Sequence, residues 1–214
     1  MFRLPVRCPR TPGYGTDSSA AKLLVPAVPG RDAVAGLPGC EEAVMGVDQP
    51  QRLPSHTPTC MGCGSDNPHG LQLEVFRCGD EVFADLVFDE RHIGAPGLAH
   101  GGAIAAACDD VLGFSLWIAA TPAVTRRLTV DYLQPVPLGC THRLTARIAS
   151  REGRALHVDG VGVGVDGVTR FTASAVFITV DAAHFAAHGD ISGFGELFAE
   201  LTRYGGAGPD AGSR

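Results

Sequence analysis

The sequence predicts an α+β domain in which an antiparallel sheet wraps around one long helix. Six segments alternate apolar and polar residues, which is typical of strands with one buried face. Short turn sequences such as Cys78-Gly79-Asp80 and Asp166-Gly167 join neighbouring segments, and links of that length favour antiparallel pairing. The segment 101–120 is apolar on most of its surface and would form a helix about 30 Å long, so the sheet has to enclose it.

These segments follow one another as two strands, the helix and four further strands. A hairpin is predicted over residues 71–88, and Pro122 stands just beyond the end of the helix. The later strands are expected near residues 128–132, 144–148, 156–165 and 171–180. Apolar residues at i, i+3, i+4 and i+7 then predict a short amphipathic helix, at Phe194, Leu197, Phe198 and Leu201.

The composition divides the chain into three parts. Residues 1–56 are rich in proline and glycine and show no sustained periodicity, which predicts a disordered or loosely packed N-terminal extension. Residues 57–182 hold the predicted sheet and central helix. Residues 183–214 form a C-terminal extension that carries the short amphipathic helix.

Composition and charge narrow the class of protein. Of the 214 residues, 45% are hydrophobic and 19% are charged, which is typical of a soluble chain that buries a core. The formal net charge of −6 argues against a nucleic-acid partner. We also expect no membrane span and no secretory signal, because we find no apolar run of the required length.

The seven cysteines are an odd number, and only Cys60 and Cys63 lie close together. This usage argues against a disulfide scaffold and favours a reducing cytoplasm. A Cys-x-x-Cys pair also suggests zinc, but a structural zinc site needs four ligands and a second pair is missing. Cys78 and His69 would complete the set only by a coincidence of folding. We therefore expect no metal and no cofactor, and a packing role for the pair.

The predicted helix begins with His100-Gly101-Gly102, and glycine is a poor helix former. The first N–H groups of a helix have no partner within it, and the dipole makes that end positive. Because glycine has no side chain, these N–H groups could closely approach and bind a carbonyl oxygen that gains negative charge. The glycines could equally serve only to ease a tight turn into the helix.

Asp109 and Asp110 are the only charges in the same segment. A carboxylate on a buried helix is costly unless it is paired or used. At 100° per residue the two cannot share a face, so Asp109 lies on a stripe with Gly102 and Ala106. Either carboxylate could also face solvent or cap a neighbouring group.

Three segments resemble one family, the PaaI-like group of hotdog-fold acyl-CoA thioesterases. AHGGAIAAACDD is similar to the family's central helix, and TRRLTVDYLQPVPLG is similar to its next strand. CMGCGSDNPHGL has the family's C-x-x-C-G-x-x-N-x-x-G-L spacing at Cys60, Cys63, Gly64, Asn67, Gly70 and Leu71. The resemblance covers roughly residues 58–180 and implies a hotdog fold with acyl-CoA as the substrate.

The resemblance also implies roles for residues of the central helix. The family has an acidic residue nine positions after the motif histidine, which here is Asp109. Asp109 would act as a general base on water or attack the thioester directly. The N–H of Gly102, alone or with that of Gly101, would polarise the thioester carbonyl. Thr125 would orient the water.

Other implied roles concern substrate binding and assembly. His100 would bind loop backbone near the substrate, and Asn67 is a second candidate for substrate binding. Arg126, with Arg127 and Arg143, could meet the nucleotide phosphates, although a solvated basic surface is the simpler interpretation. In the family the helix start and the acid come from opposite protomers, which implies a homodimer or a dimer of dimers.

The chain departs from the family at one position, and two other functions are alternatives to thioester hydrolysis. Some family members carry an asparagine six residues before the motif histidine, and this chain has Gly94 there. A hotdog domain could also bind acyl-CoA or an acyl-carrier thioester without hydrolysing it. Hotdog hydratases are disfavoured, because their D-x5-H spacing is absent: no histidine follows Asp109 or Asp110 at that distance.

Overall fold

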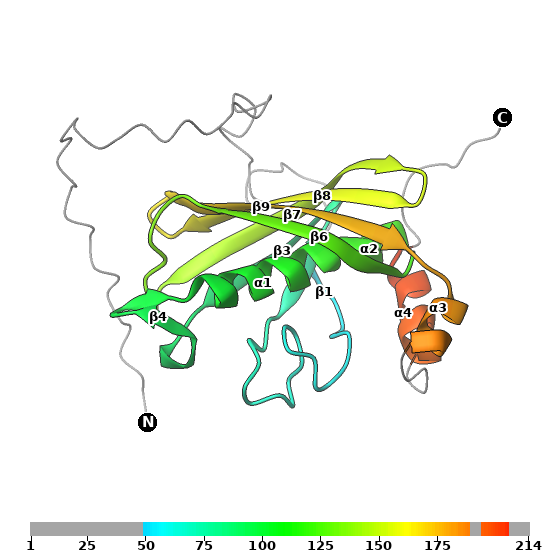
Figure 1. Cartoon of the computed structure of the whole chain (residues 1–214), viewed down its shortest axis with the longest axis horizontal. Helices are drawn as coiled ribbons and strands as arrows, with labels where there is room; N and C mark the ends of the chain where they lie inside the picture. Colours follow the sequence, from blue (N-terminus) through cyan, green and yellow to red (C-terminus); the bar gives the residue numbers. More distant parts are fainter. Residues whose placement is uncertain (1–48, 189–193, 206–214) are drawn as a thin grey trace. The chain divides into compact units, whose positions relative to one another are not determined.

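The computed structural model describes residues 49–188 and 194–205. Seven strands form one antiparallel sheet in the order β1-β2-β3-β7-β8-β9-β6 (Figure 1). The strands are β1 (Gln51–Arg52), β2 (Val75–Cys78), β3 (Glu81–Val87), β6 (Ala123–Tyr132), β7 (Thr141–Glu152), β8 (Ala155–Gly164) and β9 (Thr169–Thr179). A separate pair, β4 (Ile93–Ala95) and β5 (Leu98–Ala99), precedes the central helix.

The central helix α1 (Gly101–Gly113) lies along one face of this sheet and contacts β3, β6, β7, β8 and β9 (Figure 1). Its inward side chains are buried with those of the strands, among them Ile104, Val111 and Leu112. The predicted sheet around a central helix, the hotdog arrangement, is therefore confirmed. The predicted single helix over residues 101–120 is divided, because a turn at Phe114 separates α1 from α2 (Ser115–Ala119).

The expectation that no segment is long and apolar enough for a membrane span needs correction. By length and composition the helical segment Gly101–Ala119 could cross a membrane, with a mean hydropathy of 1.4. Half of that segment is buried inside the domain. Its enclosure by the sheet accounts for its apolar surface, since the core helix of a folded domain passes the same test.

The N-terminal edge of the sheet differs from the prediction in two respects. Residues 71–74 are not a strand, because the N–H groups of Leu71 and Leu73 bond to the carbonyls of Met61 and Gly62. The hairpin is shorter and joins β2 to β3. β1 pairs with β2, and Leu53 is buried in the core, so the folded domain begins within the predicted extension, before residue 57.

Two helices follow the sheet. α3 (Ala182–His188) was not predicted, whereas α4 (Phe194–Gly205) contains the predicted amphipathic helix. Leu201 of α4 is buried with the core, and α4 packs against α2. Residues 1–48, most of the predicted N-terminal extension, lie outside the described residues.

The cysteines differ in state. Cys60, Cys63 and Cys108 are free thiols. Cys78 and Cys140 are disulfide-bonded, which the count of cysteines did not predict.

The buried His142 gives the domain a pH-dependent stability. Its ring is 1% exposed, and burial lowers the pKa of its imidazole, so the unfolded chain binds a proton more readily than the folded chain. The stabilisation is present above the unfolded pKa of about 6.5 and is lost as the pH falls below it. We expect the free energy of unfolding, measured with urea, to fall on acidification from about pH 7 to about pH 5. His142→Gln should make that fall shallower, and an unchanged slope would contradict this assignment.

Candidate active site

The start of α1 is capped by the side chain of His100. The imidazole Nδ1 accepts a hydrogen bond from the N–H of Gly102 at 2.9 Å, and the His100 carbonyl accepts those of Ala103 and Ile104. A Cβ at Gly102 would lie 2.9 Å from that Nδ1, so the cap needs glycine there. Since the N–H of Gly102 is engaged, the expected role of Gly102 as oxyanion donor is not supported, and the N–H of Gly101 is the donor left without a partner among the described residues.

Two neighbours fix the backbone around this helix start. The hydroxyl of Tyr132, at the end of β6, donates to the carbonyl of Gly101 at 2.8 Å. The sequence did not single out Tyr132, although it belongs to the DYLQP segment of the family resemblance. A Cβ at Gly94 would lie 2.6 Å from the Cα of His100, so an asparagine cannot stand there in this backbone.

The structure brings together Asp109 and Thr125, two residues to which the family resemblance gives catalytic roles. The hydroxyl of Thr125, on β6, donates to Oδ1 of Asp109 at 3.0 Å. The carboxylate is half-buried, and Thr125 is exposed. A carboxylate held by a neighbouring hydroxyl is fixed in orientation and still reaches solvent, which suits a group that must act on water.

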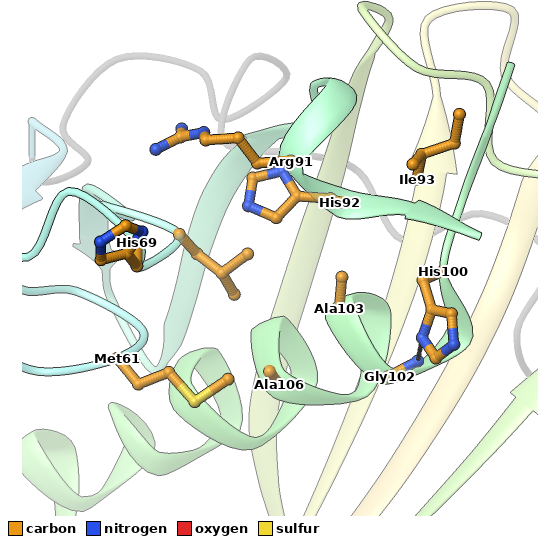
Figure 2. Close-up of a pocket in the computed structure, with 10 residues that line it drawn as sticks. Met61, His69, Arg91, His92, Ile93, His100, Gly102, Ala103 and Ala106 are labelled. Atoms are coloured by element: carbon orange, nitrogen blue, oxygen red, sulfur yellow. Dashed lines mark hydrogen bonds between the residues drawn. The ribbon is translucent and has the colours of Figure 1, made fainter.

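A cleft of about 280 Å³ opens beside the start of α1 (Figure 2). Ala103 and Ala106 form its helical side, where their small side chains leave room beside α1. The remaining lining residues are Met61, His69, Leu71, Arg91, His92, Ile93, His100 and Gly102. Asp109 does not line the cleft, but it follows Ala106 by three positions, almost one helical turn further along α1.

The other predicted binding residues take different positions. Asn67 is tied into its own loop, since its amide donates to the carbonyls of Thr59 and Cys60 and its oxygen accepts from the N–H of His69. Asn67 is therefore a structural residue rather than a substrate ligand in this conformation. Arg126 is exposed at a bulge of β6, next to Thr125.

The expected arginine group does not form. Arg143 lies on β7, which two strands separate from β6. It makes a bidentate ion pair with Asp85 at 2.9 and 3.0 Å. Only Arg126 and its neighbour Arg127 remain on the strand that carries Thr125.

The neighbouring carboxylate, Asp110, lies on another side of α1 and meets a second cluster. His56, Cys60 and Cys63 surround it, and its side chain is only 10% exposed. Burial raises the pKa of Asp110, whereas hydrogen bonding from Cys63 and His56 lowers the pKa of Cys60. Burial alone would lower the pKa of His56, but its bonds with Asp110 and Cys60 outweigh burial and raise it to about 9.

The chain was compared with known proteins. Residues 96–169 match the model of the Thioesterase superfamily. The matched segment begins just before the His100 cap and includes α1, Asp109 and Thr125. A crystal structure of a thioesterase superfamily protein is similar over 56% of this chain and 60% of its own, with a TM-score of 0.54 and 24% identity, which shows the shared fold.

Curated relatives match parts of the chain. Acyl-coenzyme A thioesterase THEM4 of Xenopus laevis is 39% identical over 61 residues, which are 28% of each chain. THEM4 of Mus musculus is 36% identical over 89 residues, 41% of this chain and 38% of that protein. THEM4 of Bos taurus is 30% identical over 121 residues, 55% of this chain and 50% of that protein. The matches thus span half or less of the length of these relatives.

Proposed function

We propose that the chain is an acyl-CoA thioesterase, which hydrolyses a fatty or aryl acyl-CoA to the free acid and CoA. The observation that carries the proposal is the hydrogen bond from Thr125 of β6 to Asp109 of α1, the helix whose N-terminus opens onto the cleft. The similarity to THEM4 over its matched segment supports the same activity.

The site supplies what thioester hydrolysis needs. Asp109, held by Thr125, either removes a proton from the attacking water or attacks the carbonyl carbon to give an anhydride. The N–H of Gly101 stabilises the negative charge that develops on the carbonyl oxygen, aided by the positive end of α1. The CoA thiolate is a good leaving group and needs little help.

A single chain cannot assemble this site. Gly101 and Asp109 are eight positions apart on one helix, so they are separated by about 12 Å along its axis. The oxygen and the carbon of one thioester carbonyl need groups only about 3 Å from each. We therefore propose a homodimer in which Gly101 of one protomer faces Asp109 of the other. β6, the ten-residue strand at one end of the sheet, offers an exposed edge for such pairing.

A CoA-release assay tests this proposal. Purified protein is incubated with short, medium, long-chain and aromatic acyl-CoAs, and free thiol is followed with a chromogenic disulfide. We expect turnover of at least one class. Tight acyl-CoA binding without release of CoA from any substrate would instead favour the non-catalytic binding domain.

Loss of the Thr125 hydroxyl should lower the rate of hydrolysis without abolishing it. Thr125→Ala removes the hydrogen bond to Asp109 and should lower kcat about tenfold, since the carboxylate keeps its chemistry and loses its orientation. Thr125→Ser keeps the hydroxyl and serves as the matched control. Equal rates for the alanine and serine variants would show that this bond does not contribute to catalysis.

A further inference from the structure

Four side chains that the proposed reaction does not use converge on one point beside α1. They are His56, Cys60 and Cys63 from the segment 53–74, which we call the CxxC loop, and Asp110 from the helix. One ligand atom from each of the four lies within 4.8 Å of the others. The structure thus supplies two ligands, His56 and Asp110, that the sequence analysis did not find when it looked for partners of the cysteine pair.

We propose that these four side chains bind one Zn²⁺ ion in a tetrahedral site. The donor set is one imidazole nitrogen, two thiolate sulfurs and one carboxylate oxygen, all of which are zinc ligands. The two sulfurs disfavour magnesium and calcium, which take oxygen ligands. Since the protein fills all four positions, none is left for water or substrate, and the site is structural.

The distances within the cluster are those expected around a bound cation. Nδ1 of His56 lies 3.3 Å from Sγ of Cys63 and 3.4 Å from Oδ1 of Asp110, and that same oxygen lies 3.6 Å from Sγ of Cys60. The edges of a tetrahedron around zinc are about 3.3 to 3.8 Å long, given bonds of about 2.0 Å to nitrogen or oxygen and 2.3 Å to sulfur. A direct ion pair between imidazolium and carboxylate would be shorter, at about 2.8 Å.

One buried polar atom of the cluster also lacks a hydrogen-bond partner, which a cation would supply. Oδ2 of Asp110 is buried and has no hydrogen-bond partner among the described residues. The backbone N–H of His56 lies 3.3 Å from Sγ of Cys63, a contact that would stabilise a metal-bound thiolate from outside the ligand shell.

The CxxC loop is built to approach the helix at this point. A Cβ at Gly62, between the cysteines, would lie 2.2 Å from Cγ of Asp110, so only glycine lets the loop approach so closely. The loop contains no helix or strand, and long segments of that kind usually have a functional reason to be ordered. Met61, His69 and Leu71 of this loop line the cleft, so the cation would fasten one side of the cleft to α1.

The test is metal analysis of the purified full chain, prepared without added metal or chelator and with any affinity tag removed. We expect about one zinc per chain by inductively coupled plasma mass spectrometry. Cys60→Ser with Cys63→Ser should bring the zinc content close to zero. Cys108→Ala removes a free buried cysteine of α1 outside the cluster and should keep the zinc of the wild type.

A second measurement on the wild-type chain covers the case in which the double variant does not fold. Exchange of zinc for Co²⁺ should give the intense visible bands of a tetrahedral site and a near-ultraviolet band from thiolate ligands. Removal of zinc by a chelator should lower Tm by at least about 5 °C. Wild-type protein that holds no zinc even after incubation with it, or a Cys60–Cys63 disulfide in freshly prepared protein, would overturn the proposal. Zinc binding by these four side chains does not depend on whether the chain hydrolyses acyl-CoA.

Discussion

Asp109→Asn should lower kcat for acyl-CoA hydrolysis by about 10²- to 10⁴-fold, the range expected when a general acid or base is lost. The amide has almost the same shape as the carboxylate and can still accept the hydrogen bond from Thr125. It can neither remove a proton from water nor attack the thioester. KM should change much less than kcat, because the substituted group acts on the reacting atoms rather than on the bound nucleotide.

The control for this variant is Asp159→Asn, which removes the same charge from an exposed position on β8. Circular dichroism and gel filtration should show both variants folded and with the oligomeric state of the wild type. If Asp109→Asn keeps the wild-type kcat while the protein is folded, Asp109 has no part in the reaction.

Gly101→Pro should lower kcat by about 10²- to 10³-fold, the effect of removing one donor of an oxyanion hole. Proline removes only the N–H that we assign to the oxyanion. The fold should tolerate it, because proline is favoured at the first position of a helix and its fixed φ suits that position. The preceding residue, His100, already has φ −68° and ψ 136°, the conformation that a following proline requires.

Gly101→Ala is the matched control, because it adds a Cβ and keeps the N–H. That Cβ would lie 3.4 Å from the ring of Tyr132, an ordinary contact. The alanine variant should therefore keep most of the wild-type rate. A proline variant as active as the alanine variant would exclude the Gly101 N–H from transition-state stabilisation.

Periodicity sufficed to predict the central architecture. The alternating strands were found because their pattern reports one buried face, and the helix was found because a segment that is apolar on most of its surface has to be enclosed. The short strand β1 and the divided helix were not found. Two residues are too few for a period. Gly113, directly before the turn at Phe114, is a poor helix former and marks the break, but a single glycine within a long apolar run is a weak signal.

The candidate site was predictable only in part. The family resemblance pointed to Asp109 rather than Asp110 as the acid, but nothing in the sequence showed that His100 occupies the N–H of Gly102. The contacts of Tyr132, Arg91 and His92 were not predictable, because these residues reach the helix start or the cleft through tertiary contacts.

The two consecutive aspartates illustrate the same limit. Helical geometry predicted that Asp109 and Asp110 point in different directions, and the structure assigns them different neighbours. Asp109 meets Thr125 of β6, whereas Asp110 meets the CxxC loop. His56 could have been noticed as the first residue of an H-x3-C-x2-C spacing. The fourth ligand of the proposed zinc site, Asp110, lies far along the chain from these three residues.

The claim that two protomers share each catalytic site is tested most directly by mixing two inactive variants. Asp109→Asn and Gly101→Pro proteins are unfolded together, refolded as a mixture and assayed for CoA release. We expect recovery of about a quarter of the wild-type activity, since half of the dimers are mixed and one of the two sites in each is intact. Activity no higher than the sum of the two variants refolded separately, in a mixture shown to contain mixed dimers, would contradict a shared site.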